Sequence, residues 1–482
     1  MKWLGYVVYA IYVILTLWLL IYAIAQLHLM HHARVRRKRA AQRRPSVLPF
    51  VSVQVPVYNE RYVIEGLLES LAALDYPKHL YEIQVLDDST DETSELIDRQ
   101  AVLLTERGVN ITVVRRDTRT GYKAGALQHG LALCKGDLVA IFDADFRPPP
   151  SFLMLLVPYF NDEKVGLVQA RWGHINRGEN FLTRIQTYLL DMHFMVEQEG
   201  RYQAGYFINF CGTAGIWRRK CITEAGGWDG SVLSEDLDLS YRAQLKGWKI
   251  LYDKDVEVPA LLPAQVPAFR IQQFRWTKGI AQIAKKVLRP LWKKPLPFGK
   301  KLHGSFHLLG SVSFVCLFIN AILTVPLLML RNHYPEFVQL TNYTAIGALN
   351  LAALAFLYYK SSTEHIGKGT NFLIHYPLFL LVYLAMSVQN SIAVIQGLVG
   401  VHSPFVRTPK DPSGAMGGHS YVKRTVNWIS LLEAGLLAYF LYAIGLSFYL
   451  RDYFLLFFFV LMSGGLSILV YHSFMPQKQL AA

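Results

Sequence analysis

The sequence predicts two kinds of structure in one chain: an α/β domain with a parallel sheet, and an α-helical transmembrane bundle. Three observations lead to this prediction. The first is composition, because 52% of the 482 residues are hydrophobic and only 17% are charged, against roughly 25% charged in soluble domains. The second is that long apolar runs occur near both ends of the chain. The third is a central segment in which strand-like and helix-like stretches alternate, which is typical of parallel α/β sheets.

The first apolar run, Leu4–Leu29, contains no charged residue and exceeds the roughly 20 helical residues that span a bilayer. It is too long for a cleaved signal peptide and is followed by a polybasic stretch over 31–44. We therefore predict a transmembrane anchor at 1–30 and a cytoplasmic linker at 31–45. The net charge of +14 also allows a nucleic-acid-binding protein. However, the densest basic block directly follows a span, so we expect no nucleic-acid partner.

Residues 302–475 are predicted to form the transmembrane bundle, followed by a tail at 476–482. The third of five apolar segments carries polar residues in its middle, so it is either a further span or an interfacial helix. The basic loop at 402–424 is expected to be cytoplasmic, which favours five spans over six and a multi-pass protein in contact with membrane lipids. The apolar segments are Phe306–Leu330, Thr344–Tyr359, Phe372–Val399, Trp428–Leu450 and Tyr453–Val470.

The predicted α/β domain covers 46–301 and is expected to be cytoplasmic. Apolar strands are predicted at 51–57, 83–86, 111–114 and 138–142, with helices between them. Acidic residues follow two of these strands, namely Asp87 and Asp88 in one case and Asp143 and Asp145 in the other. Ligands of such sheets bind beyond the carboxyl ends of the strands, so these carboxylates mark a candidate site.

The D-x-D sequence at Asp143 and Asp145 can present two carboxylates to one cation. Hard oxygen ligands suit Mg²⁺ or Mn²⁺, which often bridge to substrate phosphates. Lys123 opens a predicted helix, and helix N-termini with a nearby lysine favour phosphate. The alternatives are an acidic loop and a solvated surface lysine.

Two further motifs carry chemical groups. Ser234-Glu235-Asp236 opens a helix, so Ser234 suggests an N-cap, while one of the carboxylates is a candidate general base. Further on, Arg275 and Trp276 offer a guanidinium for phosphate and a flat face for a sugar ring. The alternative for that segment is an amphipathic interfacial helix with membrane anchors.

Together these motifs resemble the pattern D, D-x-D, (T/S)-E-D and Q-x-x-R-W. The chain reads Asp87-Asp88, Asp143-Ala144-Asp145, Ser234-Glu235-Asp236 and Gln272-Gln273-Phe274-Arg275-Trp276. The sequence therefore resembles the processive, membrane-embedded family 2 glycosyltransferases of the cellulose synthase superfamily, and most closely the plant cellulose synthase-like A and C proteins, which make β-1,4-mannan and β-1,4-glucan. The resemblance implies a GT-A-like nucleotide-sugar-binding fold for the α/β domain.

The resemblance also implies a role for each matching residue. Nucleotide-sugar contacts fall on Tyr58, Glu60, Asp87, Asp88, Lys123 and Asp143, and metal ligation on Asp143 and Asp145. Catalysis falls on Asp236 as base, with Glu235 beside it. Acceptor and diphosphate contacts fall on Cys211, Gly212, Gln272, Arg275 and Trp276. A gating loop is expected at Phe405, Arg407, Thr408 and Lys410, although Arg407 stands where the family pattern has Val.

The function that follows from the resemblance is inverting transfer of a hexose to a β-linked, β-1,4 polymer that is passed across the membrane. UDP-glucose is the favoured donor and GDP-mannose the alternative; a further alternative is a single transfer to a membrane lipid. The expected cofactor is Mg²⁺ or Mn²⁺. The expected partners are the nucleotide-sugar donor, a polysaccharide or lipid acceptor, and accessory export subunits. The four cysteines are widely spaced, so neither a disulfide framework nor a zinc site is expected.

Overall fold

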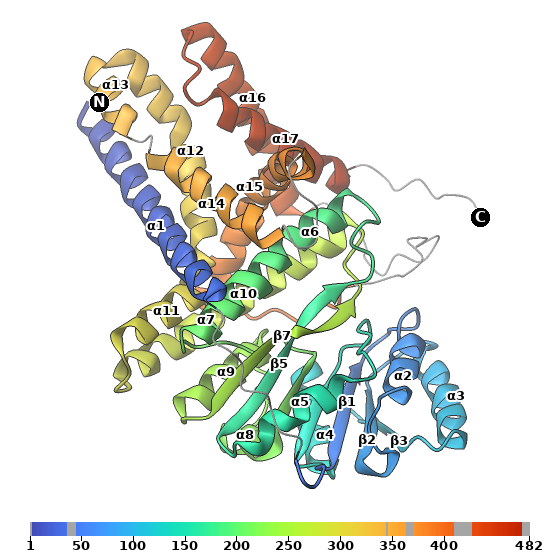
Figure 1. Ribbon diagram of the computed structural model, residues 1–482. Helices are drawn as coiled ribbons and strands as arrows, with labels where there is room; N and C mark the ends of the chain where they lie inside the picture. Colours follow the sequence, from blue (N-terminus) through green and yellow to red (C-terminus); the bar gives the residue numbers. More distant parts are fainter. Residues whose placement is uncertain (1, 36–44, 344–345, 363–369, 409–426, 475–482) are drawn as a thin grey trace.

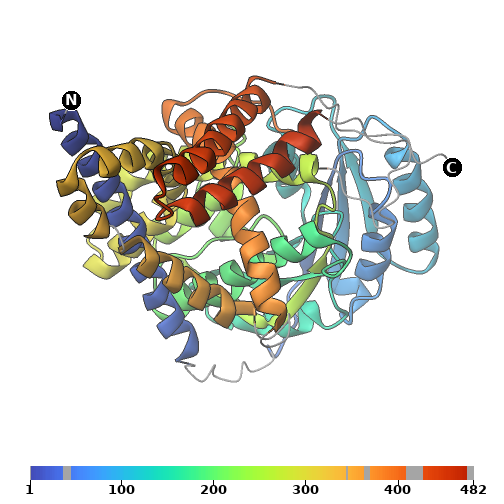
Figure 2. The ribbon, with the colours of Figure 1, turned by 90° about the horizontal axis from the view of Figure 1, so that it is seen from above.

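The structure is a computed structural model of the chain and describes residues 2–35, 45–343, 346–362, 370–408 and 427–474. Figure 1 shows an α/β domain at one end and a group of long helices at the other, with α6, α10 and α11 between them. Seen from above, α2 and α3 lie beside the long helices and not beneath them (Figure 2).

A seven-stranded sheet forms the centre of the α/β domain, in the order β3-β2-β1-β4-β6-β5-β7. The first four strands in this order are parallel, as the sequence predicts. β6 then runs antiparallel to both of its neighbours, and β7 pairs parallel with β5. The strands are β1 (Val51–Val57), β2 (Tyr81–Asp87), β3 (Ile111–Arg115), β4 (Leu138–Ile141), β5 (Val165–His174), β6 (Gly215–Arg218) and β7 (Lys249–Ala260).

Helices cover both faces of this sheet, and this explains the unbroken apolar runs of its central strands. Val53 and Val55 of β1 and Ile83 and Val85 of β2 have no exposed surface. The helices of the domain are α2 (Ile64–Ala72), α3 (Thr93–Glu106), α4 (Tyr122–Leu133), α5 (Phe152–Leu156), α6 (Phe181–Asp191), α7 (Glu199–Gln203), α8 (Arg219–Glu224) and α9 (Glu235–Leu245).

The register of the parallel strands places their carboxyl ends at one edge. Val57 of β1 is level with Asp87 of β2, and Gln54 of β1 is level with Ile141 of β4. The loops that carry the acidic motifs therefore leave the sheet side by side.

Within the part of the chain that the structure describes, six helical segments are long and apolar enough to cross a membrane. This number is one more than the favoured five and equals the alternative of six. The helices of this region are α1 (Lys2–Arg34), α10 (Val266–Lys293), α11 (Phe298–Leu309), α12 (Val312–His333), α13 (Pro335–Tyr343), α14 (Ile346–Ser362), α15 (Thr370–Val399), α16 (Trp428–Leu450) and α17 (Leu456–Phe474). The segment predicted at Phe306–Leu330 is divided near Gly310 between α11 and α12, because its first residues continue a helix that packs on α10.

α15 is one continuous helix through the polar run that interrupts its apolar sequence. Near its start, Phe372 and Phe379 contact Tyr188 of α6. Farther along, Gln389 and Gln396 bind residues of α10. The helix thus contacts, along much of its length, the helices that join the bundle to the α/β domain. This is the geometry of the interfacial alternative, although length and composition also allow a span, so five spans stays a prediction.

A buried ion pair connects α10 to the bundle. Arg270 Nη2 donates to Glu433 Oε1 of α16 at 2.7 Å, and the Glu433 side chain has no exposed surface. The other Arg270 nitrogens donate to Gln389 Oε1 at 2.9 Å and Ser473 Oγ at 3.0 Å. One guanidinium therefore joins α10 to three helices of the bundle.

We expect Glu433→Gln to lower the free energy of unfolding by about 3–5 kcal/mol, because it leaves a buried arginine without a counter-charge. Thermal unfolding of the detergent-solubilised protein measures this. The double variant Arg270→Met/Glu433→Leu removes both charges and should recover most of the loss. Equal losses in the single and double variants would contradict the explanation. The exposed pair of Lys249 and Asp162 provides the control, since Asp162→Asn should cost about 0–1 kcal/mol.

Candidate active site

A cleft lies at the edge of the sheet where the parallel strands have their carboxyl ends. Its volume is about 1120 Å³, including the part that is open to solvent. It brings together residues from loops after β1, β2 and β4, from the start of α9, from α10 and from the segment after α15. Of the predicted site residues, those that line it are Tyr58, Glu60, Asp88, Lys123, Asp143, Asp145, Cys211, Gly212, Glu235, Asp236, Gln272, Arg275, Trp276, Phe405, Arg407 and Thr408. Segments far apart in sequence thus form one site.

Two arginines that the sequence does not mark as site residues lie near β1 and β2: Arg119 lines the cleft, and Arg116 binds the cleft residue Asp88. The guanidinium carbon of Arg119 lies 3.3 Å from the centre of the Tyr58 ring. Arg116 binds both carboxylate oxygens of Asp88. The signal was available, because Arg115, Arg116 and Arg119 follow the predicted third strand in the same way that the acidic residues follow its neighbours.

Asp87 lies outside the cleft. Its carboxylate accepts hydrogen bonds from Arg115 Nε at 2.9 Å, Ser94 Oγ at 2.8 Å and the Ser89 amide at 3.0 Å. Asp87 is the last residue of β2, and Asp88 follows on the other face of the extended chain. The geometry therefore gives Asp87 a structural place at the strand end, in contrast to its predicted contact with the donor.

Lys123 and Asp143 form an ion pair in the middle of the cleft. Lys123 Nζ donates to Asp143 Oδ1 at 2.6 Å and to the Gly212 carbonyl at 2.8 Å. Burial alone would lower the pKa of Lys123, but the carboxylates of Asp143 and Glu235 outweigh it and raise that pKa. The Asp143 amide in turn donates to Thr213 Oγ1 at 2.9 Å. The D-x-D loop and the Cys211–Thr213 loop are thus held together.

The carboxylates of the D-x-D loop can be tested as ligands of a divalent cation. Asp143 and Asp145 both line the cleft, and among the described residues no group of three or more His, Cys, Asp or Glu side chains is arranged to hold a metal. Two carboxylates suit Mg²⁺ or Mn²⁺, since such ions complete their coordination with water and phosphate oxygens. The residues present therefore fit a cation shared with a substrate.

Glu235 and Asp236 form the first turn of α9 and face the cleft. Asp236 Oδ1 accepts from the Leu237 amide at 2.8 Å. Burial and the neighbouring charge of Glu235 raise the pKa of Asp236 to about 7, and burial raises the pKa of Glu235 as well. Ser234 occupies the N-cap position as expected, but its side chain makes no capping hydrogen bond, and its Oγ lies against Gly279 of α10.

The opposite end of the cleft is formed by α10 and aromatic residues. Trp276 lies 6.4 Å from Trp172 of β5, ring centre to ring centre. Gln272 is buried, and Arg275 has a buried Nε without a hydrogen-bond partner among the described residues. Burial lowers the pKa of Arg275 against the opposing effect of Glu235. Burial and the charge of Asp236 raise the pKa of Cys211, so its thiol is neutral.

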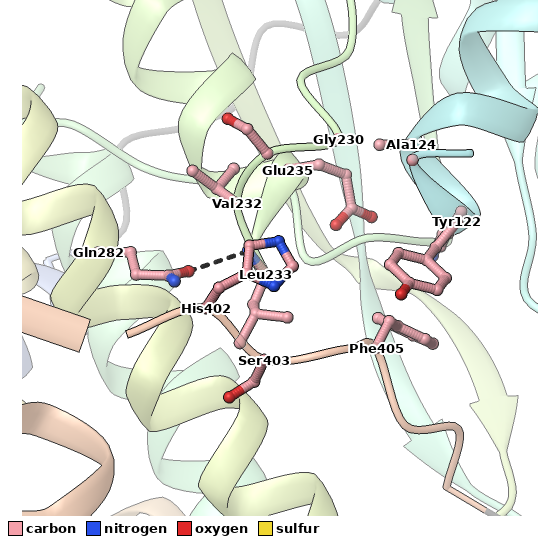
Figure 3. A pocket seen from close by; sticks show the side chains of 13 residues that line it. Tyr122, Ala124, Gly230, Val232, Leu233, Glu235, Gln282, His402, Ser403 and Phe405 are labelled. Carbon is pink, nitrogen blue, oxygen red and sulfur yellow. Dashed lines mark hydrogen bonds between the residues drawn. The ribbon is translucent and has the colours of Figure 1, made fainter. Parts of the chain in front are cut away.

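The segment after α15 closes over the cleft. Phe405 lies between the Tyr122 ring, 5.9 Å from centre to centre, and the Arg275 guanidinium, whose carbon is 4.3 Å from the Phe405 ring centre. Figure 3 shows Phe405 and Tyr122 next to each other on one side of a smaller adjoining pocket. Arg407 Nε and Nη2 donate to the two oxygens of Glu60 at 2.7 and 2.5 Å. Lys410, the last predicted gating residue, lies outside the described residues.

A cleft at the carboxyl edge of this sheet, with a D-x-D loop, a buried carboxyl pair and an arginine opposite, defines a GT-A-like domain suited to nucleotide sugars. Residues 49–279 match the family model described as glycosyltransferase-like family 2. The predicted fold class is therefore confirmed: a GT-A-like mixed α/β domain together with several long apolar helices. The predicted enzyme class, a glycosyltransferase, is confirmed for this domain.

Curated relatives extend this match. The chain is 41% identical over 296 residues to glucomannan 4-beta-mannosyltransferase 1 of Oryza sativa subsp. japonica, covering 58% of this chain and 57% of that protein. It is 37% identical over 363 residues to glucomannan 4-beta-mannosyltransferase 7 of Arabidopsis thaliana, covering 73% of this chain and 62% of that protein. The chain thus spans less than two thirds of the length of these relatives.

Among solved structures, the chain is similar to the mannosyltransferase PcManGT from Pyrobaculum calidifontis, determined in complex with GDP-Man and Mn²⁺. The TM-score is 0.59 at 21% identity, and the match covers 82% of this chain and 100% of that chain. At this identity the likeness concerns the fold.

We expect Gly212→Ala to impair the site beyond its effect on stability. Gly212 has a φ of +81°, and an added Cβ would lie 3.2 Å from Asp236 Oδ2 and 3.4 Å from Lys123 Nζ. Gly108 has a φ of +77°, but among the described residues no atom lies within 4 Å of an added Cβ, so Gly108→Ala is the matched control. Both variants should lose about 1–2 kcal/mol of stability, whereas Gly212→Ala alone should slow sugar transfer more than tenfold. Equal transfer rates in the two variants would show that the crowding has no effect on the site.

Proposed function

We propose that the protein is a membrane-embedded inverting glycosyltransferase that builds a β-1,4-linked mannan from GDP-mannose. The observation that carries this proposal is the meeting of the D-x-D loop, the Asp236 carboxyl and the Gln272–Trp276 motif in one cleft. The two relatives described above are both named as glucomannan mannosyltransferases. They favour the mannose alternative over the UDP-glucose donor that the sequence analysis put first.

We assign the donor nucleotide to the end of the cleft that lies next to β1 and β2. There, Tyr58 presents a ring to a base, and Asp88 and Arg119 offer an acceptor and donors for its edge. The diphosphate would lie near Lys123 and Arg275, whose charges oppose those of the phosphates. Mg²⁺ or Mn²⁺ held by Asp143 and Asp145 would supply further positive charge to the leaving diphosphate.

We assign Asp236 as the general base. Its carboxylate accepts the proton of the attacking acceptor hydroxyl, and that oxygen attacks the anomeric carbon on the face opposite the diphosphate, so an α-linked donor yields a β linkage. Arg275 and Lys123 stabilise the negative charge that develops on the leaving group. Burial raises the pKa of Asp236, and repulsion from the adjacent Glu235 in the first turn of α9 raises it further.

We assign the acceptor to the end of the cleft formed by α10, where Trp172 and Trp276 offer ring faces for sugars. Phe405 and Arg407 would seal the donor end, as in the predicted gating loop. A cytoplasmic α/β domain with a bundle at its acceptor end suits passage of the growing polymer across the membrane, with accessory export subunits as further partners.

The decisive experiment offers purified protein in lipid nanodiscs labelled GDP-mannose, UDP-glucose, GDP-glucose or UDP-N-acetylglucosamine with Mg²⁺ or Mn²⁺. We expect incorporation from GDP-mannose into a product that an endo-β-1,4-mannanase degrades, and loss of activity with EDTA. A polymer supports processive synthesis, whereas a single mannosyl lipid supports the alternative of lipid transfer. Incorporation from UDP-glucose alone would overturn the proposed donor.

The variant Asp236→Asn tests the role of Asp236 as the base, because asparagine keeps the size of the side chain but cannot accept the proton. Transfer should fall at least 10³-fold while binding of GDP-mannose stays within about threefold. Normal transfer by this variant would show that Asp236 is not the base.

We also expect a pH dependence set by Asp236. A general base works only when deprotonated, and burial raises the pKa of Asp236 to about 7. The value of kcat/KM for the donor should therefore rise about tenfold per pH unit below pH 7 and level off above it. Initial rates between pH 5 and 9 measure this, with donor binding at each pH as the control. A rate that is flat from pH 5 to 7 would contradict the assignment.

A further inference from the structure

A π-helical turn interrupts the long helix that lies between the α/β domain and the bundle. It covers Met192–Gln198 and joins α6 to α7. π-helical turns are rare and occur often at functional sites, because the extra residue per turn moves side chains out of the α-helical pattern. This turn carries His193 and Glu197, which neither the predicted motifs nor the proposed mechanism uses.

His193 and Glu197 belong to a chain of hydrogen bonds that begins in the cleft. Cys211 Sγ lies 3.6 Å from His193 Nε2, and His193 Nδ1 lies 2.9 Å from Glu197 Oε2. Arg201 Nη2 donates to the same Glu197 oxygen at 3.1 Å, and its Nε donates to the Glu197 carbonyl at 3.0 Å. Because an ionised carboxylate only accepts, the neutral imidazole carries its proton on Nδ1, and in that tautomer Nε2 presents its lone pair to the Cys211 thiol.

Two side-chain amides donate to the sulfur of the same thiol. The side-chain amides of Gln198 and Asn209 point their nitrogens at Cys211 Sγ, at 3.4 and 3.6 Å. Their carbonyl oxygens are buried and, within the described residues, have no hydrogen-bond partner; both side chains are at least nine-tenths buried. Unpaired buried carbonyls are costly. The two amide nitrogens donate to the sulfur, and His193 Nε2 is an acceptor for the thiol proton.

The location suits an acceptor sugar. Cys211 lines the cleft next to Gly212, whose added Cβ would touch Asp236. The His193 and Glu197 side chains keep 27% and 20% of their surface exposed, so they are reachable and not core residues. On its other side the π-helical turn packs against α1 of the bundle. The turn therefore stands where the base Asp236 meets the bundle.

We propose that the π-helical turn forms an acceptor subsite in which His193 Nε2 accepts a hydrogen bond from a hydroxyl group of the terminal acceptor sugar, in place of the Cys211 thiol. Glu197 is a positioning residue that fixes the imidazole tautomer, and Arg201 holds Glu197. The ligand class is a β-linked oligosaccharide. This inference rests on the proposed function and adds the residues that recognise the acceptor. It predicts that the turn affects acceptor binding and leaves donor binding unchanged.

The test uses the full-length protein in nanodiscs with GDP-mannose as donor and added β-1,4-mannotetraose as acceptor. We expect His193→Phe to raise KM for mannotetraose at least tenfold while the Kd for GDP-mannose changes less than twofold. His193→Gln, whose carbonyl oxygen can replace Nε2, should recover most of the loss, and Glu197→Gln should give an intermediate KM. His79→Phe, at an exposed position in the α/β domain, is the matched control and should leave both constants unchanged.

The outcomes separate the inference from the proposed function. An unchanged acceptor KM in His193→Phe would overturn the subsite, as would parallel losses of donor and acceptor affinity, which indicate a structural role. No rescue by His193→Gln in a variant with a wild-type melting temperature would also overturn the role of Nε2. If the wild-type protein bound no GDP-mannose, the proposed function would fail first. In that case, binding of mannotetraose alone, measured for wild type and His193→Phe by calorimetry, still decides whether the subsite exists.

Discussion

The ion pair of Lys123 and Asp143 is the interaction on which the rest of the cleft depends. Six carboxyl groups and four cationic side chains line the cleft. Without close pairing to the cations, the carboxylates would repel one another. Lys123 is the cation at the centre, and it also binds the Gly212 carbonyl. It thus joins α4, the D-x-D loop and the loop before β6. A substrate that brings its own phosphates and a divalent cation replaces one set of paired charges with another.

Much of this cleft was predictable, because its acidic residues follow strands. The sequence shows where a strand ends, and parallel strands end at a common edge. Hence Asp88, Asp143 and Asp145 were expected to meet, and they line one cleft. Asp87 was not distinguished from Asp88, because the choice depends on which face of β2 each side chain takes and on Arg115 across the sheet. Arg116 and Arg119 were missed because a basic run suggests a solvated surface until its partners are seen.

The less predictable parts depend on contacts between distant segments. The sequence of α15 indicates an apolar helix, but its place along α6 and α10 follows from pairs such as Gln389 with Arg270, which are 119 residues apart. The division between α11 and α12 likewise follows from packing on α10. His193 gave no signal, since a single histidine in an apolar helix is ordinarily a packed residue. Its importance rests on a π-helical turn and on Cys211, eighteen residues farther along the chain.

One helix connects the cleft to the bundle, and this constrains how the two parts can move. On α10, Gln272, Arg275 and Trp276 are three and four residues apart, so they share the face that lines the cleft. Arg270 and Lys278 of the same helix bind other parts of the chain. Arg270 binds Glu433 of α16. Lys278 Nζ donates to Gln396 Oε1 of α15 at 2.9 Å and to Ser403 Oγ, in the segment that covers the cleft, at 2.5 Å.

A rotation of α10 would therefore move Arg275, the buried Arg270–Glu433 pair and the covering segment together. Because Lys278 has no exposed surface, breaking its contacts without new partners would leave a buried ammonium unpaired, at a cost of several kcal/mol. The position of the covering segment and the packing of the bundle are thus coupled through the same helix. The π-helical turn belongs to a different helix, and its contacts with Cys211 lie outside this coupled set.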